Sequence, residues 1–399
     1  MNYQQKALEM HAQWKGKIEI ASRAPLACKD DLSVAYTPGV AEPCREIAKN
    51  KDLVYSYTRK WNLVAIVTDG SAVLGLGNIG PEAGMPVMEG KAVLFKEFAG
   101  VDAFPICLAT QNVDEIVDAV AAIAPTFGGI NLEDISGPRC FDIEARLIER
   151  LDIPVFHDDQ HGTAVVVLAA LLNALKITGE KMGNLRVVVN GSGAAGIAIT
   201  RLMQPLGVGD VVMLDTKGII ARSRTDLTPV KRQVAEHTNA DNLAGDLKTA
   251  LKGAHVFVGV SAANLVSRDM VKSMAGCRYV FALANPDPEI LPDEAKAAGA
   301  RIVATGRSDF ANQVNNVLGF PGIFRGALDV RARRIDDAMK LAAARALADA
   351  VPADKLNEDF ILPSPLDKSV PPKVAAAVAN TARERGLARS IACNGNAGN

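Results

Sequence analysis

Residues 186–196 read RVVVNGSGAAG and continue into the helix-forming stretch IAITRLM. The apolar run Arg186–Asn190 predicts a buried strand, and the pattern G-x-G-x-x-G follows it directly. A second strand-like run then ends at Asp215, nineteen residues after Gly196. A strand, a glycine-rich turn, a helix and a second strand with a terminal acid are typical of the dinucleotide-binding unit of a Rossmann fold.

The glycines of this turn have distinct expected roles. Gly191 allows a tight turn, Gly193 lets backbone N–H groups approach a pyrophosphate, and Gly196 lets helix and strand pack closely. The helix N-terminus adds partial positive charge, and Asp215 would accept hydrogen bonds from ribose hydroxyls. The predicted dinucleotide site comprises Gly191, Ser192, Gly193, Ala194, Ala195, Gly196 and Asp215.

The choice between NAD and NADP stays open at this point. Asp215 would repel a 2′-phosphate and therefore favours NAD. Cations follow it closely, and any of them could fold over to bind that phosphate; a solvated surface face is the alternative explanation for them. These cations are Lys217, Arg222, Arg224 and Lys231.

A second G-x-G-x-x-G pattern, Gly75–Gly80, lacks the Rossmann context. Pro81 and Pro86 follow it, so we expect no helix to start there. No strand with a terminal acid follows at the required distance. We interpret this stretch as a loop and as a candidate for lining the active site.

The wider pattern predicts an α/β fold. Helical stretches such as Thr163–Lys176 and Ala194–Met203 alternate with short β-branched runs that are apolar throughout, as in a parallel sheet buried on both faces. The strand-like runs are Val64–Thr68, Val187–Asn190, Val211–Leu214, Val256–Val260 and Tyr279–Leu283.

The length of 399 residues favours two or three domains at roughly 150 residues per domain. We expect an N-terminal α/β substrate- and metal-binding domain over residues 1–160 and a Rossmann domain over residues 161–335. A C-terminal helical extension, residues 336–399, would pack back on them. It contains Ala-rich helical stretches at Asp336–Ala350 and Lys373–Arg385 and a Pro-punctuated segment, Ile361–Pro372, between them.

Composition excludes several classes of function. The net charge of −1 and the low aromatic content argue against a nucleic-acid binder. The longest apolar run, Ala164–Leu172, is shorter than the ~20 residues that span a bilayer, and the N-terminus does not resemble a signal peptide. None of the six cysteines forms a CxxC pair. A cytoplasmic protein without membrane association is expected.

Two acidic clusters lie where loops are expected. Glu133 and Asp134 follow the glycine-rich FGGI, and Asp158 and Asp159 precede a helix in FHDDQHGT. Adjacent carboxylates repel each other unless a cation lies between them, which favours a hard divalent cation such as Mg²⁺ or Mn²⁺. Ordinary capping of the following helix by Asp159 is the alternative.

A zinc site is a third interpretation, because His157 and His161 have the spacing found in HExxH. That motif requires a glutamate as general base, whereas Asp158 occupies the position here, and Gly162 would weaken the helix. No third ligand stands at a recognisable distance. The zinc interpretation is therefore disfavoured.

Lys91 and Tyr36 form a candidate acid–base pair. Lys91 is an isolated cation in a run otherwise suited to burial, and burial would lower its pKa and make it a usable general base. Tyr36 precedes the turn TPGV, where its side chain could be held rigidly. A lysine that reaches solvent and a tyrosine in a core are the commoner alternatives.

Together these segments resemble the malic enzyme family, and in particular its compact bacterial type. The similarity extends over about residues 20–335, and ILPSPLD resembles the C-terminal region of the family. The resembling stretches are SVAYTPGVAEPC, VTDGSAVLGLGNIGPEAGMPVMEGKAVLFKEFAG, PTFGGINLEDI, PVFHDDQHGTA, NGSGAAG, LANPDPEI and TGRSDFANQVNNVLGFPGIFRGALD.

The resemblance implies oxidative decarboxylation of L-malate to pyruvate and CO₂ with NAD or NADP and Mg²⁺ or Mn²⁺. It also implies a homodimer or larger homo-oligomer. Carried onto matching positions, it assigns Glu133, Asp134 and Asp159 as metal ligands. It assigns Lys91 as general base and substrate contact, Tyr36 as general acid, and Asp158 as part of the same catalytic network. Asn285, Asn315 and Asn316 would contact the substrate, and Asn285 and Asn316 would also reach the nicotinamide.

One departure concerns the substrate carboxylate. Larger eukaryotic members carry an arginine shortly after the TDG triplet, whereas Ser71 follows it here. Two other functions share most of these features: a malolactic enzyme or plain malate dehydrogenase using the same site, and a non-enzymatic dinucleotide sensor. Product analysis separates the first from a malic enzyme, and turnover excludes the second.

Overall fold

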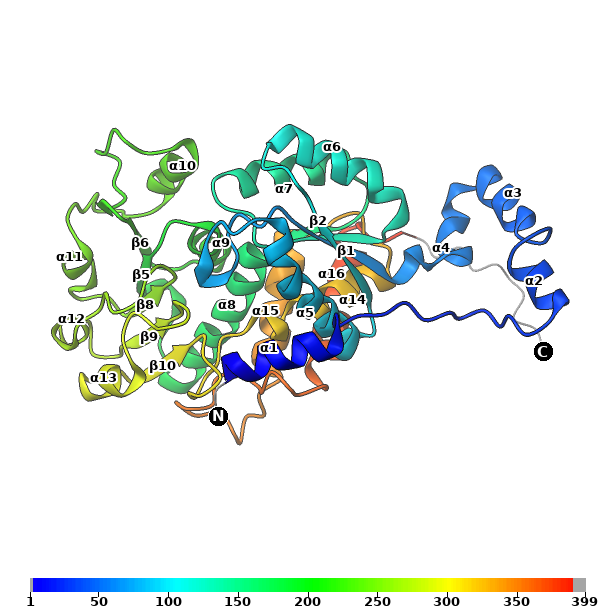
Figure 1. Ribbon diagram of the computed structural model, residues 1–399. Helices are drawn as coiled ribbons and strands as arrows, with labels where there is room; N and C mark the ends of the chain where they lie inside the picture. Colours follow the sequence, from blue (N-terminus) through cyan, green and yellow to red (C-terminus); the bar gives the residue numbers. More distant parts are fainter. Residues whose placement is uncertain (1–2, 390–399) are drawn as a thin grey trace.

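The computed structural model describes residues 3–389, in which two sheets flanked by helices organise the chain (Figure 1). The first sheet has the order β2-β1-β3-β4, and all its pairs are parallel. Because β1 continues to β2 on one side and the chain returns to β3 on the other, the carboxyl ends of β1 and β3 flank a topological switch point. The strands are β1 (Leu63–Thr68), β2 (Asp102–Cys107), β3 (Gly129–Leu132) and β4 (Val155–His157).

The second sheet has the order β10-β9-β8-β5-β6-β7, with only the short β7 antiparallel. The chain leaves β5 toward β6 and later returns to β8 on the other side, which gives a second switch point. This arrangement confirms the predicted Rossmann unit. The strands are β5 (Arg186–Asn190), β6 (Asp210–Asp215), β7 (Gly218–Ile219), β8 (Val256–Gly259), β9 (Tyr279–Ala282) and β10 (Ile302–Thr305).

Helix α8 (Asp158–Thr178) joins the two halves. It begins immediately after β4, and its buried side chains share one hydrophobic cluster with Val64 and Phe95 of the first half and Val187 of the second. By length and composition it could cross a membrane, but 67% of that window is buried inside the protein. It is therefore the central core helix.

Further helices cover the sheets and close the fold. The last three, α14, α15 and α16, belong to the same hydrophobic cluster as α8. The helices are α4 (Val54–Tyr57), α5 (Pro81–Ala99), α6 (Val113–Ile123), α7 (Arg139–Arg150), α9 (Ala194–Met203), α10 (Pro229–His237), α11 (Leu247–Leu251), α12 (Arg268–Lys272), α13 (Pro292–Ala297), α14 (Phe320–Asp329), α15 (Asp337–Asp349) and α16 (Val370–Glu384).

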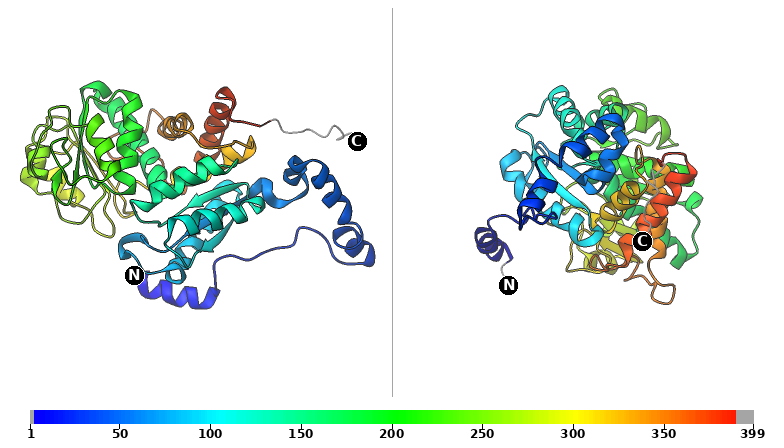
Figure 2. Two further views of the ribbon diagram at one scale, coloured as in Figure 1. Left: turned by 90° about the horizontal axis from the view of Figure 1, so that it is seen from above. Right: turned by 90° about the vertical axis from the view of Figure 1, so that its right-hand side faces the viewer.

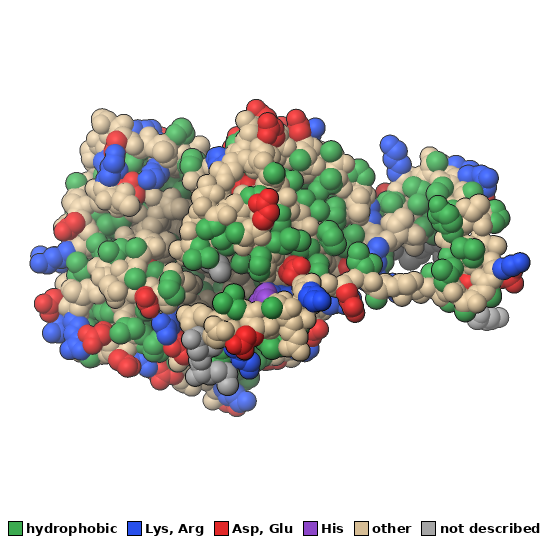
Figure 3. Space-filling view, in the orientation of Figure 1, with side chains coloured by type: hydrophobic (Ala, Val, Ile, Leu, Met, Phe, Trp, Pro, Cys, Tyr) green, Lys and Arg blue, Asp and Glu red, His purple; other side chains and the backbone are tan. Residues whose placement is uncertain are grey.

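Residues 3–50 form an N-terminal arm that begins alongside the body and then extends away from it through α2 and α3 (Figures 1 and 2). It comprises α1 (Tyr3–Trp14), an extended segment, α2 (Lys29–Ala35) and α3 (Ala41–Lys49), and none of the three helices contains a buried residue. Large apolar side chains of the arm face solvent in the single chain, among them Ile20 at 87% and Val34 at 76% exposure. Figure 3 shows apolar side chains over α2 and α3.

The five strand-like runs recognised in the sequence all coincide with strands, to within one or two residues. The C-terminal helical stretches correspond to α15 and α16, and Pro371 and Pro372 lie in the first turn of α16, where the missing N–H groups cost least. The domain boundaries at residues 160 and 335 remain a prediction, because α8 and its hydrophobic cluster belong to both halves.

One expectation is wrong: a helix does start after the second glycine pattern. Helix α5 begins at Pro81 and continues through Pro86 to Ala99. Pro81 stands at the first helical position, which suits its fixed φ and missing N–H. The stretch still differs from a Rossmann turn, because β1 ends at Thr68, seven residues before Gly75.

Candidate active site

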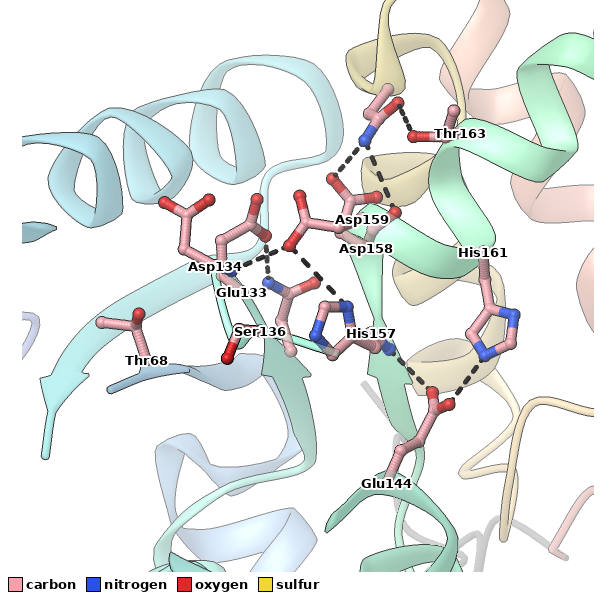
Figure 4. A network of polar contacts seen from close by, with 12 residues as sticks. Thr68, Glu133, Asp134, Ser136, Glu144, His157, Asp158, Asp159, His161 and Thr163 are labelled. Carbon is pink, nitrogen blue, oxygen red and sulfur yellow. Dashed lines mark hydrogen bonds and ion pairs between the residues drawn. The ribbon is translucent and has the colours of Figure 1, made fainter. Parts of the chain in front are cut away.

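The register of the first sheet brings the two acidic clusters together. Leu132 of β3 is paired with His157 of β4, so the acids that follow each strand emerge at the same edge (Figure 4). The backbone N–H of Asp134 donates to Asp159 Oδ2 over 2.8 Å, which ties the two loops directly. Asp134 adopts φ of +54°, one of the few positive values among non-glycine residues. The strand register and this hydrogen bond therefore hold the carboxylates together at one edge of the sheet.

Glu133, Asp134 and Asp159 offer one oxygen each within 4.8 Å of one another. Glu133 and Asp134 are buried. Burial raises the pKa of Glu133 well above its ordinary value; the charge of Lys91 opposes this rise, and the neighbouring carboxylates add to it. Three carboxylate oxygens suit a hard divalent cation and not zinc, which favours nitrogen and sulfur donors. The group contains no histidine, so the described residues do not support the zinc interpretation.

Lys91, on α5, enters this cluster from the opposite side. Its Nζ lies 2.6 Å from Asp158 Oδ2 and 2.9 Å from Glu133 Oε1, and 4.4 Å from the centre of the Phe320 ring. Burial alone would lower its pKa, but the charges of Asp158 and Glu133 outweigh burial and raise it. The expectation of a lowered pKa is therefore wrong for this arrangement: two adjacent carboxylates stabilise the ammonium form.

Gly162 is required by the position of Asp158 one helical turn earlier. A Cβ at Gly162 would lie 1.9 Å from Asp158 Oδ1. The fully buried Asp158 uses its other oxygen to bind Lys91 and to accept a hydrogen bond from Asn316 Nδ2 at 3.2 Å. The glycine therefore leaves room for the carboxylate inside the first turn of α8.

The three predicted asparagines are placed differently. Asn316 belongs to the cluster, because it donates to Asp158 and accepts from Thr163 Oγ1 at 3.0 Å. Asn315 instead accepts from the N–H of Val317 at 3.0 Å and caps a short 3-10 helix. Asn285 is exposed at the carboxyl end of β9, and its backbone oxygen lies 2.9 Å from the position a Cβ would take at Gly75.

The dinucleotide turn faces the acidic edge. Gly191 has φ of +123°, and a Cβ at Gly196 would meet the oxygen of Gly191 at 1.8 Å, whereas a Cβ at Gly193 would meet nothing within 4 Å. The backbone N of Ala194, at the start of α9, lies 3.9 Å from the Cβ position of Gly137, three residues after Asp134. The helix N-terminus that would receive a pyrophosphate therefore adjoins the loop of the carboxylates.

Asp215 ends β6, as expected, but its carboxylate is already engaged. It accepts hydrogen bonds from the Lys217 N–H at 2.9 Å, from Arg224 at 2.8 Å and from Lys231 Nζ at 2.7 Å. These bonds outweigh partial burial and lower the pKa of Asp215 to about 2. Two of the four predicted cations thus bind Asp215, while Arg222 donates to the backbone of Ala240.

Tyr36 does not join the cluster within one chain. It follows α2 in the N-terminal arm, and 67% of its surface is exposed. Figure 1 shows α2 well separated from α5, which carries Lys91. The structure therefore brings together Lys91, Glu133, Asp134, Asp158, Asp159 and Asn316, and leaves Tyr36 outside.

Two side chains near the site were not recognised in the sequence. Glu144 on α7 accepts hydrogen bonds from the His157 N–H and the His161 ring, both at 2.9 Å, and so holds the junction of β4 and α8 (Figure 4). Although burial opposes it, His161 and Lys340 lower the pKa of Glu144 to about 2. Glu144 interrupts the apolar face formed by Cys140, Ile143 and Leu147, and that was the available signal.

The position of the missing arginine is filled by a tight polar loop. Ser71 Oγ binds Asp69 and accepts from the Ser136 N–H at 2.9 Å. An arginine from α7, Arg139, reaches the same place and pairs with Asp69 at 3.0 Å. Its charge is neutralised there by a fully buried carboxylate side chain.

Comparison with known proteins identifies both halves. Residues 15–148 match the family described as "Malic enzyme, N-terminal domain", and residues 160–383 match "Malic enzyme, NAD binding domain". The chain is 57% identical over 390 residues to the bifunctional malic/malolactic enzyme of Bacillus subtilis, covering 98% of this chain and 95% of the relative. It is 58% identical over 374 residues to an NAD-dependent malic enzyme of Geobacillus stearothermophilus, covering 94% and 78%.

A crystal structure shows the same architecture. The malic enzyme of Pyrococcus horikoshii superimposes with a TM-score of 0.92 at 51% identity, covering 97% of this chain and 92% of that one. The two family matches span most of the residues, and both relatives are more than 50% identical to the chain. The chain belongs to the malic enzyme family.

Proposed function

We propose that this protein catalyses the oxidative decarboxylation of L-malate to pyruvate and CO₂, with NAD or NADP as hydride acceptor. The observation that carries the proposal is the pair of Lys91 with the fully buried Asp158 beside the three-carboxylate cluster, at an edge adjoined by the dinucleotide turn. A proton acceptor, a cation site and a hydride acceptor are the three parts that this reaction needs.

Glu133, Asp134 and Asp159 would hold a divalent cation, Mg²⁺ or Mn²⁺, because their oxygens converge and are largely withdrawn from water. When bound, such a cation polarises the C2 oxygen and stabilises the negative charge of the enolate. With the charge of Glu133 engaged by that cation, less negative charge would face Lys91. The pKa of Lys91 would then fall, and its ammonium would release a proton more readily. That change would prepare Lys91 to act as a base.

Lys91 would accept the C2 hydroxyl proton while the C2 hydride passes to the nicotinamide. Asp158, whose Oδ2 lies 2.6 Å from Nζ, would keep the amine oriented and share its proton. Breaking the C3–C4 bond then releases CO₂ and leaves its electron pair on the enolate. Asn316, bound to Asp158, and Asn285, at the end of β9, would orient substrate and nicotinamide. Asn315 would act through the backbone it caps.

Purified protein with malate and Mn²⁺ is expected to reduce NAD or NADP and to form equal amounts of pyruvate and CO₂. Absence of reduction with both cofactors contradicts the proposal. Lactate without net reduced cofactor would replace the proposal with the malolactic reaction, which the name of the Bacillus subtilis relative includes. Oxaloacetate without CO₂ would replace it with a plain malate dehydrogenase.

For protonation of enolpyruvate at C3 we propose Tyr36 of a second copy in a homodimer. The arm leaves Tyr36 exposed and remote from Lys91 of its own chain, and exposes Ile20, Leu26 and Val34 beside it. Apolar side chains concentrated on an extended arm are typical of an interface. A reciprocal exchange of arms would bury these side chains and complete both sites at once.

Mixing two inactive variants tests the exchange. If Tyr36 acts in the partner's site, Tyr36→Phe and Lys91→Met subunits combine into dimers in which one site has both residues intact. Random mixing would then restore about one quarter of wild-type activity, since half of the dimers are mixed and each has one complete site. If Tyr36 acts within its own chain, no mixed site is complete and activity stays at background.

We further propose that the adenosine ribose lies at Asp215 and that Arg224 and Lys231 accommodate a 2′-phosphate when one is present. Both cations are already held at the end of β6, so a phosphate would need only their reorientation. Cytoplasmic localisation is proposed as well, since the five described cysteines are all free and the cofactor is intracellular.

A further inference from the structure

A cavity lies away from the acidic cluster, between the base of the arm and the C-terminal end of the described chain. Its volume is about 880 Å³, within the usual range for small-molecule sites. Its lining includes Ile47 of α3, Tyr55 of α4, Leu151 after α7 and Arg389 after α16. Segments distant in sequence therefore meet around it.

The lining of this cavity is rich in cations. It carries Lys51, Lys60, Arg333 and Arg389 against two carboxylates, Asp52 and Asp152. Both acids are already paired: Asp52 with an arginine outside the lining, and Asp152 with two of the lining arginines. Their partners are Arg331 for Asp52 at 2.7 Å, and Arg333 at 3.2 Å together with Arg389 for Asp152.

Lys60 is the most buried of these cations, with 8% of its surface exposed. Its Nζ donates to the carbonyl oxygens of Ala124 at 3.0 Å and Pro125 at 2.9 Å and lies 5.4 Å from the Tyr55 ring centre. No carboxylate among residues 3–389 pairs with it. Burial, with the charge of Arg389 in addition, lowers the pKa of Lys60 to about 8. The cavity therefore contains a buried positive charge without a counter-charge.

We propose that this cavity binds a small anion with several negative charges, carried by phosphate or carboxylate groups, as an effector site separate from the catalytic cluster. An anion beside Lys60 would supply the missing counter-charge, and Arg333, which is 55% exposed and pairs with Asp152 at 3.2 Å, could turn to bind two of its oxygens while Arg389 stays with Asp152. The proposal does not depend on the reaction proposed above, because none of these residues belongs to that site.

Thermal unfolding in the presence of inorganic phosphate or propane-1,2,3-tricarboxylate tests the site, with KCl at equal ionic strength and excess Mg²⁺ throughout. Both anions are expected to raise the unfolding temperature beyond KCl, and calorimetric titration then gives each dissociation constant. The tighter anion identifies the charged group that the site prefers. No rise with either anion overturns the proposal.

Two arginines of equal exposure provide the matched comparison. Arg333 and Arg268 each have 55% of the side chain exposed and each pair with one acid, but Arg268 lies on α12, outside the cavity. Arg333→Gln should weaken anion binding roughly five- to tenfold, and Arg268→Gln should leave it unchanged. Equal affinity in both variants would mean that the anion binds elsewhere, for example at the dinucleotide turn, and would overturn the assignment.

Lys60→Met gives the larger effect, because it removes the buried charge and keeps the apolar stem. Binding should fall at least about twentyfold in the folded variant, whose circular dichroism and NAD(P)-dependent turnover report its integrity. Unchanged anion affinity in this variant also contradicts the proposal. If Lys60→Met does not fold, the Arg333→Gln comparison still decides.

Discussion

Both sheets have a topological switch point, but the groups that they present there differ in chemistry. Each has a switch point at the carboxyl ends of its parallel strands, but the first presents side-chain carboxylates and Lys91 there, whereas the second presents glycines and the backbone N–H groups at the start of α9. The topology therefore decides where a site lies, and the residues after each strand decide what it binds.

The largest effect is expected from replacing Lys91, at the edge of the first sheet that carries the carboxylates. Lys91→Met should lower kcat by about 10³-fold, because the proposed general base is lost while the helix and its apolar contacts remain. Steady-state kinetics and circular dichroism measure the effect. Lys96→Met is the control: it lies on the same helix and pairs with Asp102, and its side chain is 58% exposed. An equal loss in both variants would show that helix α5, and not the amine of Lys91, is responsible.

At the dinucleotide turn of the second sheet, the effect of a substitution should depend on the space available for a Cβ. Gly196→Ala is expected to destabilise the protein by ~3 kcal/mol, because its Cβ would stand 1.8 Å from the oxygen of Gly191. Gly193→Ala should leave the unfolding temperature unchanged, since its Cβ meets nothing, yet raise KM for the dinucleotide about tenfold. Chemical denaturation and initial rates separate the two, and equal stability of both variants would contradict the distinction.

Removing one carboxylate should weaken cation binding more than it weakens the fold. Asp159→Asn is expected to raise the Mn²⁺ concentration for half-maximal activity about 10- to 100-fold. Activity should recover in part at high Mn²⁺. Asp118→Asn, which alters an exposed acid paired with Arg150, should leave the Mn²⁺ dependence unchanged. A loss of activity that no Mn²⁺ concentration restores would assign Asp159 a role other than binding the cation.

The smallest expected effect lies at the far end of the dinucleotide. Lys231→Gln should raise KM for NADP about threefold to tenfold and change KM for NAD by less, because only NADP carries the 2′-phosphate. Initial rates with both cofactors at saturating malate decide it. An equal change for both cofactors would place Lys231 outside the ribose site and leave Asp215 as its only partner.

The two edges also differ in how far the sequence predicts them. The Rossmann turn is contiguous, so spacing and glycine positions suffice from Arg186 to Asp215. The acidic site depends on the register of β3 with β4 and on Lys91, which is 67 residues from Asp158. Local sequence singles out the two acidic clusters and Lys91 as candidates but does not show that they meet, and the family resemblance supplied their roles and the asparagines.

Other differences have local physical causes. Strand β2 contains Pro105 and β3 begins at Gly129, so neither reads as a strand. The raised pKa of Lys91 follows from two carboxylates brought by other elements, which burial of a lone lysine does not predict. The position of Tyr36 depends on how the N-terminal arm is placed relative to the two sheets, and the periodicity of the sequence does not specify that placement.

Helix α8 has a mechanical consequence. Its first turn carries Asp158 and Asp159, and the same unbroken rod continues through the hydrophobic cluster shared by both sheets. A force applied to the dinucleotide half would reach these carboxylates through a stiff lever instead of a loop. Any closing movement of the two halves must therefore bend at the ends of α8, and Asp158 and Asp159 would move as one body with the core.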